Sequence, residues 1–347
     1  MLSRMVFLLS LVLVWAGIAS AEETPEPRVV LVWPTENRAL AEGRPQDYFQ
    51  TTISNRAVSG MYGFVRSNLP EPPPYLERFH EGIDIRPVRR DAANRPLDPV
   101  RAVAPGKVVY TNTLASRSNF GLYVVIEHTY GPYKAYTTYG HMAKISVERG
   151  QQVAAGDEIG IVGHTGNVDN LEKSHLHFEF GFMLNDAFSS WYDKNAEKAE
   201  GKNLHGIYNG NNLFGVDPAR LLMDSQQGKA PTIREIFARE KAIFRVRVPL
   251  DAGLTYWQKQ FPFMTMGWEK GKKQVAWEVD ANRIGIPLAF RPSDVEAPAP
   301  ELVWFDDSLS LQNSFTRGLV EKDRKSGKRR LSKYGLKWAT LLTWKAE

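Results

Sequence analysis

The stretch His175-Leu176-His177-Phe178-Glu179-Phe180 alternates polar and apolar side chains along six residues. In a β-strand, neighbouring side chains point to opposite faces, so His175, His177 and Glu179 share one face. The apolar residues between them then face a hydrophobic core. This pattern predicts a strand that brings two imidazoles and a carboxylate together along a cleft.

A second polar motif, His80-Glu81-Gly82-Ile83-Asp84, carries an imidazole and a carboxylate four residues apart. Gly82 lets the backbone fold so that both side chains point inward. Together with His177, they offer two nitrogen ligands and one oxygen ligand, a set that suits Zn²⁺ and leaves a fourth position for water. Such an open position is typical of catalytic zinc sites. We therefore predict one zinc ion, held by His80, Asp84 and His177.

A third motif, Tyr139-Gly140-His141, ends a predicted strand. His141 and His175 are then histidines that are not needed as metal ligands. We predict that these two are catalytic, one as the general base toward the attacking water and one as the stabiliser of the tetrahedral oxyanion. Glu179 is better interpreted as a partner that orients an imidazole than as the base.

The remaining histidines favour structural interpretations. His128 follows a predicted strand over 123–127, where a capping or packing role is expected. His164 lies in a glycine turn and should be solvated, whereas His205 lies in a loop that could contact substrate. A His-x-His pair is weak on its own, because seven histidines among 347 residues produce one by chance about one time in eight.

The composition is that of an ordinary globular chain, with 43% hydrophobic and 24% charged residues. The formal net charge of +5 suits an anionic neighbour but is too small to identify one. The absence of cysteine excludes a disulfide scaffold, a thiol nucleophile and any Cys-ligated metal site. The chemistry must therefore use nitrogen and oxygen ligands.

The first residues predict an export signal. Arg4 precedes a short apolar run over 5–16, and Ala19-Ser20-Ala21 is a small-x-small cleavage pattern. The run is shorter than the roughly 20 residues that a spanning helix needs. We expect a signal peptide over 1–21, cleaved after Ala21, with a retained anchor as the alternative. The protein is then expected in the periplasm or outside the cell, without a stable membrane span and without nucleic acid as a partner.

The rest of the chain divides by composition. Short runs rich in valine, isoleucine, tyrosine and threonine predict strands from about residue 57 to 222, with turn glycines between them. Residues 223–231 are polar, with glycine and proline, and predict a linker. Thr232, with Glu235 three residues later, predicts the start of a helix that runs to Arg245. We expect a lead-in over 22–58, a zinc domain over 59–222 and a smaller β-rich domain over 232–347.

The ordered motifs His-x₃-Asp, Tyr-x-His and His-x-His resemble the LytM/lysostaphin-type zinc metallopeptidases. Further stretches resemble this family: Val103-Ala104-Pro105-Gly106-Lys107-Val108, Val153-Ala154-Ala155-Gly156-Asp157, Thr165-Gly166-Asn167 and Val216-Asp217-Pro218. The resemblance runs from about Gly60 to Leu222. It implies a mainly β fold with an antiparallel β-sheet groove, and a metalloendopeptidase that cuts peptide cross-links of bacterial peptidoglycan. It also implies His80, Asp84 and His177 as zinc ligands and His141 and His175 as catalytic residues.

Several features leave alternatives open. The loop over 168–174, the segment 86–97 and the excursion 181–212 depart from the family pattern, so substrate preference does not transfer. A tyrosine often lies over the zinc in this family, and Tyr75 is a candidate. The alternative function is a non-catalytic LytM-like regulator that activates other wall hydrolases. Residues 22–58 could inhibit the site, with Asn37 or Asn55 facing the zinc.

The C-terminal region carries two features that suit wall contact. It contains six of the nine tryptophans, and residues 321–337 have a net charge of +6. Sugar stacking by exposed tryptophans or binding of anionic polymer would fit a wall-binding domain. Buried core tryptophans and a solvated basic loop are the preferred interpretations.

Overall fold

The computed structural model describes residues 25–51, 57–64, 79–168, 170–250, 255–267, 271, 273–308, 318–323 and 325–345. The expected signal peptide, Tyr75 and Asn55 lie outside these residues. In the described part of the chain, the named strands pair only in antiparallel fashion. No helix among the described residues has the length and apolar character needed to cross a membrane. The predicted mainly β, antiparallel fold is confirmed.

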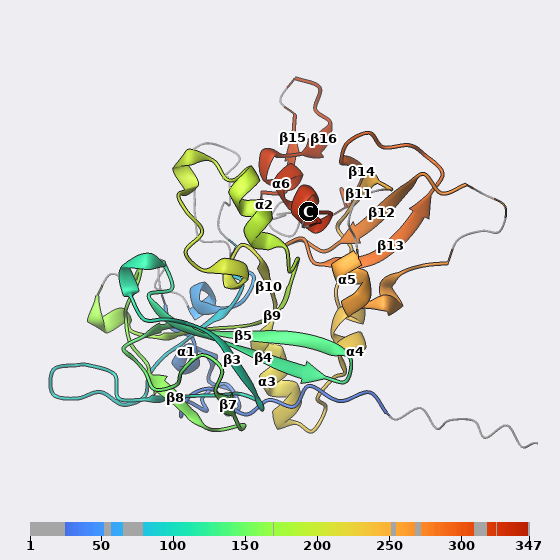
Figure 1. Cartoon of the computed structure of the whole chain (residues 1–347). Helices are drawn as coiled ribbons and strands as arrows, with labels where there is room; N and C mark the ends of the chain where they lie inside the picture. The colour runs from blue at the N-terminus through green and yellow to red at the C-terminus, as the bar shows by residue number, and fades with distance from the viewer. Residues whose placement is uncertain are drawn as a thin grey trace, which may run out of the picture.

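One large sheet forms the body of the N-terminal half (Figure 1). Its strand order is β1-β9-β5-β4-β3-β7, and β10 pairs with the free part of β9. The strands are β1 (Ile83–Ile85), β3 (Gly106–Asn112), β4 (Leu122–Tyr130), β5 (Tyr133–Met142), β7 (Gln152–Val153), β9 (Leu176–Met183) and β10 (Leu213–Val216).

β9 is the central strand, because β1, β5 and β10 all pair with it. Its apolar residues Leu176, Phe178 and Phe180 are fully buried in the core, as their alternation predicts. The opposite face of the strand carries His177 and Glu179, which are also buried. The central strand thus keeps its polar side chains largely away from bulk solvent.

A smaller three-stranded sheet lies beside the large one, in the order β2-β8-β6. Its strands are β2 (Pro99–Arg101), β6 (Lys144–Ile145) and β8 (Glu158–Ile161). Gly150 and Gly156 lie at turns and Gly166 at a bend, as predicted, whereas Gly160 lies within β8 and Gly163 forms an isolated bridge with His175. However, β7 pairs with β3 and β8 pairs with β2 and β6, so these short strands do not form local hairpins with one another.

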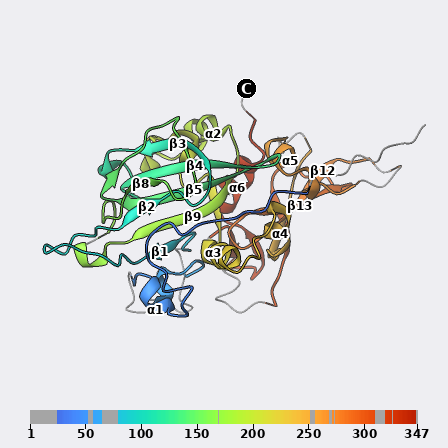
Figure 2. The same ribbon diagram turned by 90° about the horizontal axis from the view of Figure 1, so that it is seen from below.

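The N-terminal segment is part of the body rather than a separate lead-in. It contains α1 (Pro45–Tyr48) and is followed by η1 (Ala57–Gly60). Val29 N–H donates to Pro231 O, and Val32 N–H donates to Val103 O. Figure 2 shows this segment, in blue, running past α4 and α3 toward β1. Its apolar side chains, including the fully buried Val29 and Tyr48, belong to the main core.

Asn37 does not face the candidate metal site. Its side-chain NH₂ group donates to Asp47 O at 3.0 Å and to Arg86 O at 2.9 Å. The side chain is buried and ties the N-terminal segment to Arg86, the residue directly after β1. Asn37 is therefore a structural residue in this arrangement.

The C-terminal half contains a four-stranded sheet, a two-stranded hairpin and short helices. The sheet has the order β13-β12-β11-β14 and is drawn in orange in Figure 1. Its strands are β11 (Phe244–Pro249), β12 (Ala276–Ala281), β13 (Pro287–Ser293) and β14 (Glu301–Phe305), and the hairpin comprises β15 (Val320–Lys322) and β16 (Arg329–Leu331).

The helices and 3₁₀ turns of the described residues lie before, between and after these strands. The α-helices are α2 (Phe188–Asn195), α3 (Pro218–Gln226), α4 (Ile233–Ala238), α5 (Thr255–Gln260) and α6 (Lys333–Leu342). The 3₁₀ turns are η2 (Ala115–Arg117), η3 (Leu171–Lys173), η4 (Lys198–Glu200), η5 (Gly206–Tyr208) and η6 (Pro262–Met264). Residues 223–226, at the start of the expected linker, form the end of α3.

The predicted capping box at Thr232 and Glu235 is present at the start of α4. The helix ends at Ala238, however, and β11 begins at Phe244, so the prediction of a helix reaching Arg245 is wrong. In β11, Phe244, Val246 and Val248 are fully buried, while the arginines between them are more exposed. This period of two favours a strand over the helix.

The two halves share one hydrophobic core. A single cluster of buried side chains contains Val124 of the large sheet, Val246 of the C-terminal sheet and Leu341 of α6. Trp257 and Trp338 are buried within it, in agreement with the core interpretation of the tryptophans. Trp304 differs, because it is 42% exposed. The shared core indicates that the C-terminal half packs onto the large sheet.

Candidate metal centre

The register of the large sheet places Asp84 directly opposite His177. β1 and β9 pair with these two residues as partners, and Gly140 of β5 lies opposite His177 on its other side. Directly opposed residues of an antiparallel pair project their side chains to the same face. Two strands distant in sequence therefore bring Asp84 and His177 together, and Gly140, the residue before His141, lies opposite His177.

Three potential ligand atoms converge there. His80 Nε2 lies 3.1 Å from Asp84 Oδ1, and His177 Nδ1 lies 3.0 Å from the same oxygen. The two imidazole nitrogens are 3.3 Å apart. Among the described residues, His80, Asp84 and His177 form the group whose ligand atoms lie close enough to hold one metal ion. All three are buried.

Hydrogen bonds to the opposite ring nitrogens decide which atoms face the centre. His80 Nδ1 lies 2.9 Å from Met61 O, and because a carbonyl only accepts, Nδ1 carries the proton. His177 Nε2 lies 2.8 Å from Glu179 Oε1 and donates to it in the same way. His80 Nε2 and His177 Nδ1 are then left as the nitrogens that can ligate, with their outer partners fixed as in many metal sites.

Electrostatics also favour a cation at this position. Burial alone would lower the pKa of His177, but its hydrogen bonds to Asp84 and Glu179 raise the pKa to about 9. The two carboxylates therefore create a negative field around the imidazole. Two imidazole nitrogens, one carboxylate oxygen and a negative field fit Zn²⁺, and three protein ligands leave a position for water.

Gly82 is required because the loop between His80 and Asp84 lies directly against β9. A Cβ atom on this glycine would lie 2.5 Å from Phe178 O and 2.8 Å from Glu179 Cγ. The first neighbour is backbone and cannot move aside cheaply. The close approach explains the glycine that the sequence places between the two expected ligands.

His141 lies beside the three ligands in an unusual backbone conformation. Its φ is +59°, in the left-handed region of the backbone that residues other than glycine seldom adopt. The register of β5 against β4 shifts in the same region. The resulting bulge turns His141 so that Nδ1 lies 2.8 Å from Thr165 O. Nδ1 therefore donates, and Nε2 keeps its lone pair.

Burial lowers the pKa of His141 well below its ordinary value, and the neighbouring His175 and His177 lower it further. The imidazole is therefore neutral at physiological pH. Its ring centroid lies 4.8 Å from that of His175 and 5.8 Å from that of His177. A neutral imidazole with a free nitrogen beside the three ligands can accept a proton.

His175 lies immediately before β9, where it forms an isolated bridge with Gly163. Its Nδ1 lies 2.7 Å from Lys173 O and donates to that carbonyl. Its Nε2 lies 3.4 Å from Asp84 Oδ1. Because Nδ1 is committed to a carbonyl, His175 can donate a hydrogen bond from Nε2 only in its imidazolium form.

A cavity of about 630 Å³ lies beside these residues. Its floor includes Glu81, Phe120 and Glu179, and the imidazole of His177 stacks on Phe120 with ring centroids 5.0 Å apart. One side is formed by residues 115–119, and another by residues of the excursion between 200 and 211. The cavity is large enough for several residues of an extended peptide.

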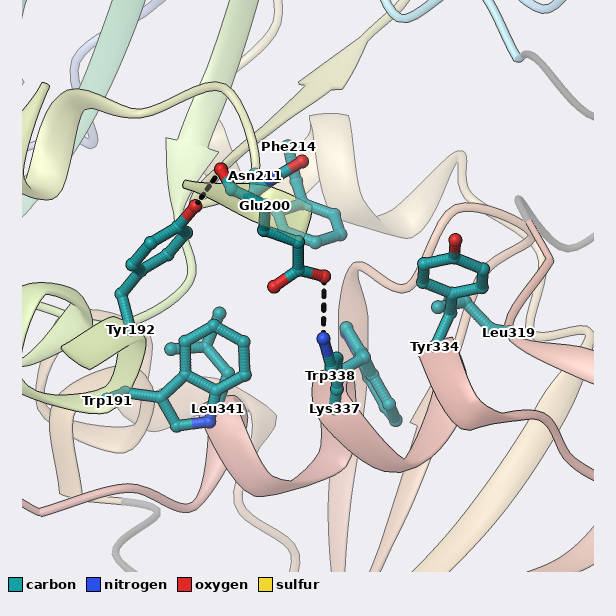
Figure 3. A pocket seen from close by; sticks show the side chains of 10 residues that line it. All are labelled: Trp191, Tyr192, Glu200, Asn211, Phe214, Leu319, Tyr334, Lys337, Trp338 and Leu341. Carbon is teal, nitrogen blue, oxygen red and sulfur yellow. Dashed lines mark hydrogen bonds and ion pairs between the residues drawn. The ribbon is translucent and has the colours of Figure 1, made fainter. Parts of the chain in front are cut away.

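A smaller pocket of about 150 Å³ lies between the excursion and α6. Figure 3 shows the carboxylate of Glu200 pointing toward Lys337, which it contacts at 2.6 Å. Tyr192 donates to Glu200 O at 3.0 Å, and both residues also line the larger cavity. The C-terminal helix thus contacts a segment that borders the candidate site.

The remaining histidines lie away from the three ligands. His128 is buried, with Nδ1 donating to Pro105 O and Nε2 2.8 Å from Thr137 Oγ1. His164 is exposed. His205 lies at the edge of the larger cavity. Sequence reasoning missed Phe120, because a phenylalanine within Asn119-Phe120-Gly121 carries no recognisable signal for stacking on a ligand.

The sheet and the buried His₂Asp cluster define a zinc-metallopeptidase type of centre. Comparison with known proteins agrees, because residues 78–187 match the sequence model of peptidase family M23. This region of the chain belongs to the M23 zinc metallopeptidases, the family of the LytM/lysostaphin type. The predicted family is thereby confirmed.

Individual relatives match about a quarter of the chain. Peptidoglycan DD-endopeptidase ShyA of Vibrio cholerae is 41% identical over 83 residues, which are 23% of this chain and 17% of that protein. Cell division protein DipM of Caulobacter vibrioides is 33% identical over 84 residues, which are 24% of this chain and 12% of that protein. The chain therefore spans less than a fifth of the length of these curated relatives.

Solved structures include similar chains. The catalytic domain of the antimicrobial peptidase lysostaphin from Staphylococcus simulans is 23% identical, with a TM-score of 0.25. The match covers 40% of this chain and 82% of that domain. A zinc-containing peptidase from Vibrio cholerae is 28% identical, with a TM-score of 0.26, and the match covers 38% of this chain and 36% of that chain.

Proposed function

We propose that the protein is an exported zinc metalloendopeptidase that hydrolyses peptide cross-links of bacterial peptidoglycan. The observation that carries this proposal is the convergence of His80 Nε2, Asp84 Oδ1 and His177 Nδ1 beside the two further histidines, His141 and His175. A regulator needs only a binding surface, whereas this cluster provides ligands and proton carriers together. The peptidoglycan DD-endopeptidase relatives ShyA and ShyB support the substrate class.

In this proposal, His80, Asp84 and His177 hold one zinc ion. When bound, zinc would polarise a substrate carbonyl and make water acidic enough to attack at neutral pH. Glu179 keeps His177 in the tautomer whose Nδ1 ligates.

His141 is the proposed general base. Thr165 O holds its Nδ1 proton, so Nε2 can accept a proton from the attacking water and return it to the leaving amine. The lowered pKa of His141 keeps it neutral and ready to accept. The left-handed backbone at His141 fixes the direction of the ring.

His175 is the proposed stabiliser of the oxyanion. Its Nδ1 is held by Lys173 O, and the carboxylate of Asp84 lies 3.4 Å from its Nε2. In the imidazolium form, this Nε2–H can donate to the oxygen that becomes negative in the tetrahedral state. The two histidines thus have different roles because their surroundings differ.

The proposal includes export, with cleavage after Ala21, and a catalytic unit over 59–222. The region 232–347 is proposed as the accessory domain, joined at 223–231. Contact of this accessory region with wall polymer is retained as a secondary proposal. It fits the exposed face of Trp304 and the basic hairpin of β15 and β16.

Mass spectrometry of purified peptidoglycan digested with the mature chain tests the proposal. We expect fragments with new amino termini, lost with a chelator and restored by Zn²⁺. The variant His141→Ala is expected to bind zinc but release no fragments. Absence of cleavage by zinc-loaded protein would overturn the enzyme proposal and favour the regulator of other wall hydrolases.

A further inference from the structure

The imidazole of His205, which itself lines the larger cavity, contacts Arg117 on another border of that cavity and Tyr110 behind it. His205 Nε2 lies 3.0 Å from Arg117 O, in the segment that leads to Phe120. His205 Nδ1 lies 2.9 Å from the hydroxyl of Tyr110, on β3. Because the carbonyl only accepts, Nε2 donates to Arg117 O and Nδ1 accepts from Tyr110. Both ring nitrogens of His205 therefore take part in hydrogen bonds.

The segment that carries His205 is held by a network of asparagines. Asn203 Oδ1 accepts from His205 N–H at 3.1 Å and from Asn209 Nδ2 at 3.3 Å. Asn212 Nδ2 donates to Ile207 O and to Asn185 O, both at 2.9 Å. These hydrogen bonds fix the backbone of the excursion and thereby the position of the His205 ring.

The segment on the other side of the bridge reaches the candidate metal centre. Phe120 stacks on His177, and Phe120 O accepts from His141 N–H at 2.7 Å. Tyr123 connects the two sides, with ring centroids 5.6 Å from Phe120 and 5.6 Å from His205. Residues 117–120 therefore extend from the bridge to the border of the proposed metal site.

We infer that His205 is a positioning residue that joins the two sides of the cavity and sets the width of the substrate cleft. It does so without contact to the proposed metal ligands. Loss of the bridge is expected to free residues 113–121 from residues 201–211. The part of this inference that concerns substrate rests on the proposed peptidase function, whereas the bridge itself does not.

Hydrogen–deuterium exchange on the metal-free full chain tests the bridge independently of activity. His205→Leu removes both hydrogen bonds and is expected to speed exchange in both 113–121 and 201–211. Tyr110→Phe removes one bond and should give a smaller increase. Tyr208→Phe is the matched control, because it removes a hydroxyl from the same aromatic cluster and keeps both bonds of His205. Unchanged exchange at 113–121 in His205→Leu would overturn the inference.

Steady-state kinetics on a soluble cross-linked peptide from peptidoglycan tests the effect on substrate. In His205→Leu we expect KM to rise about tenfold, the size of about 1.4 kcal/mol of lost binding, with kcat little changed. His205→Gln keeps a donor and an acceptor, so its KM should lie between those of the wild type and His205→Leu. Tyr110→Phe should add little in the His205→Leu background, because the two residues act through one bond.

The two readouts separate the two proposals. If the wild-type chain cleaves nothing while exchange rises as expected, the peptidase function fails and the bridge stands. If the wild-type chain cleaves and His205→Leu has the KM of the wild type, the role of His205 in cleft width is overturned. A lower kcat in His205→Leu, with the KM of the wild type, would also contradict a positioning role.

Discussion

Glu179 Oε1 lies 2.8 Å from His177 Nε2, two residues away on the same face of β9. The carboxylate accepts a hydrogen bond from Nε2–H, and Nδ1 of His177 faces Asp84. The strand period of two thus sets the tautomer of a proposed metal ligand. This relationship connects a pattern of six residues in the sequence with the chemistry of the centre.

Replacement of Glu179 by glutamine tests this connection. Glu179→Gln keeps the shape and one accepting oxygen but removes the negative charge that favours the required tautomer. We expect zinc affinity to fall about 10- to 100-fold, as for other outer partners of metal ligands. Chelator competition measures the affinity. Glu127→Gln, on β4 and paired with Lys134, is the control and should bind zinc as the wild type does.

Gly82→Ala tests the close approach of the loop to β9. The added Cβ would lie 2.5 Å from Phe178 O, which is backbone, so strain of about 1–3 kcal/mol is expected. Urea unfolding of the metal-free protein measures it. Gly267→Ala is the control, because among the described residues no atom outside its chain neighbours lies within 4 Å of its Cβ position, and the change should be within about 0.5 kcal/mol. Equal effects of the two substitutions would contradict the packing argument.

His128 is expected to make stability depend on pH. Burial lowers the pKa of His128 from 6.5 to about 4. Between these two pH values the His128 imidazole is therefore protonated in the unfolded chain but neutral in the folded chain. Its contribution is present above pH 6.5 and is lost as the pH falls toward 4, by about 3 kcal/mol for this shift. His128→Gln should flatten the pH dependence of the unfolding free energy over this range. The exposed His164→Gln should not, and identical slopes in both variants would refute the assignment.

The shared core predicts that the two halves unfold together. Asn185, which is 1% exposed, donates to Leu341 O at 2.7 Å and to Trp344 O at 2.9 Å at the end of α6. Asn185→Ala leaves these carbonyls without their donor and should cost about 2–4 kcal/mol. Calorimetry should show one transition at lower temperature.

Asn195→Ala, which removes a single bond within α2, provides the comparison for this experiment and should shift the transition less. Two separate transitions in the wild type, with only one of them moved by Asn185→Ala, would show that the halves fold independently.

The alternation in residues 175–180 predicts the strand, and the structure places His177 and Glu179 on one buried face of β9. The motif from His80 to Asp84 predicts two side chains that point inward, which the loop at Gly82 allows. These predictions succeed because they depend on local periods and on the absence of a side chain. Both features can be recognised from residues that are neighbours in the sequence.

Contacts between residues that are distant in the sequence could not be predicted from such local patterns. The position of Phe120 on His177 and the bridge of His205 to Arg117 depend on loops separated by tens of residues. The left-handed conformation of His141 follows from a bulge against β4, and nothing in Tyr139-Gly140-His141 specifies it. The N-terminal segment packs into the core for the same reason, through apolar contacts that composition alone does not assign.

Zinc stoichiometry, measured by equilibrium dialysis and elemental mass spectrometry, distinguishes metal ligands from catalytic histidines. We expect about one zinc per wild-type chain and per His141→Ala chain, because His141 is not a proposed ligand. Asp84→Ala and His177→Ala should each bind far less at the same free zinc concentration, with the fold verified by circular dichroism. Loss of zinc in His141→Ala as complete as in His177→Ala, or retention of zinc in folded His177→Ala, would contradict the proposed division between metal ligands and catalytic histidines.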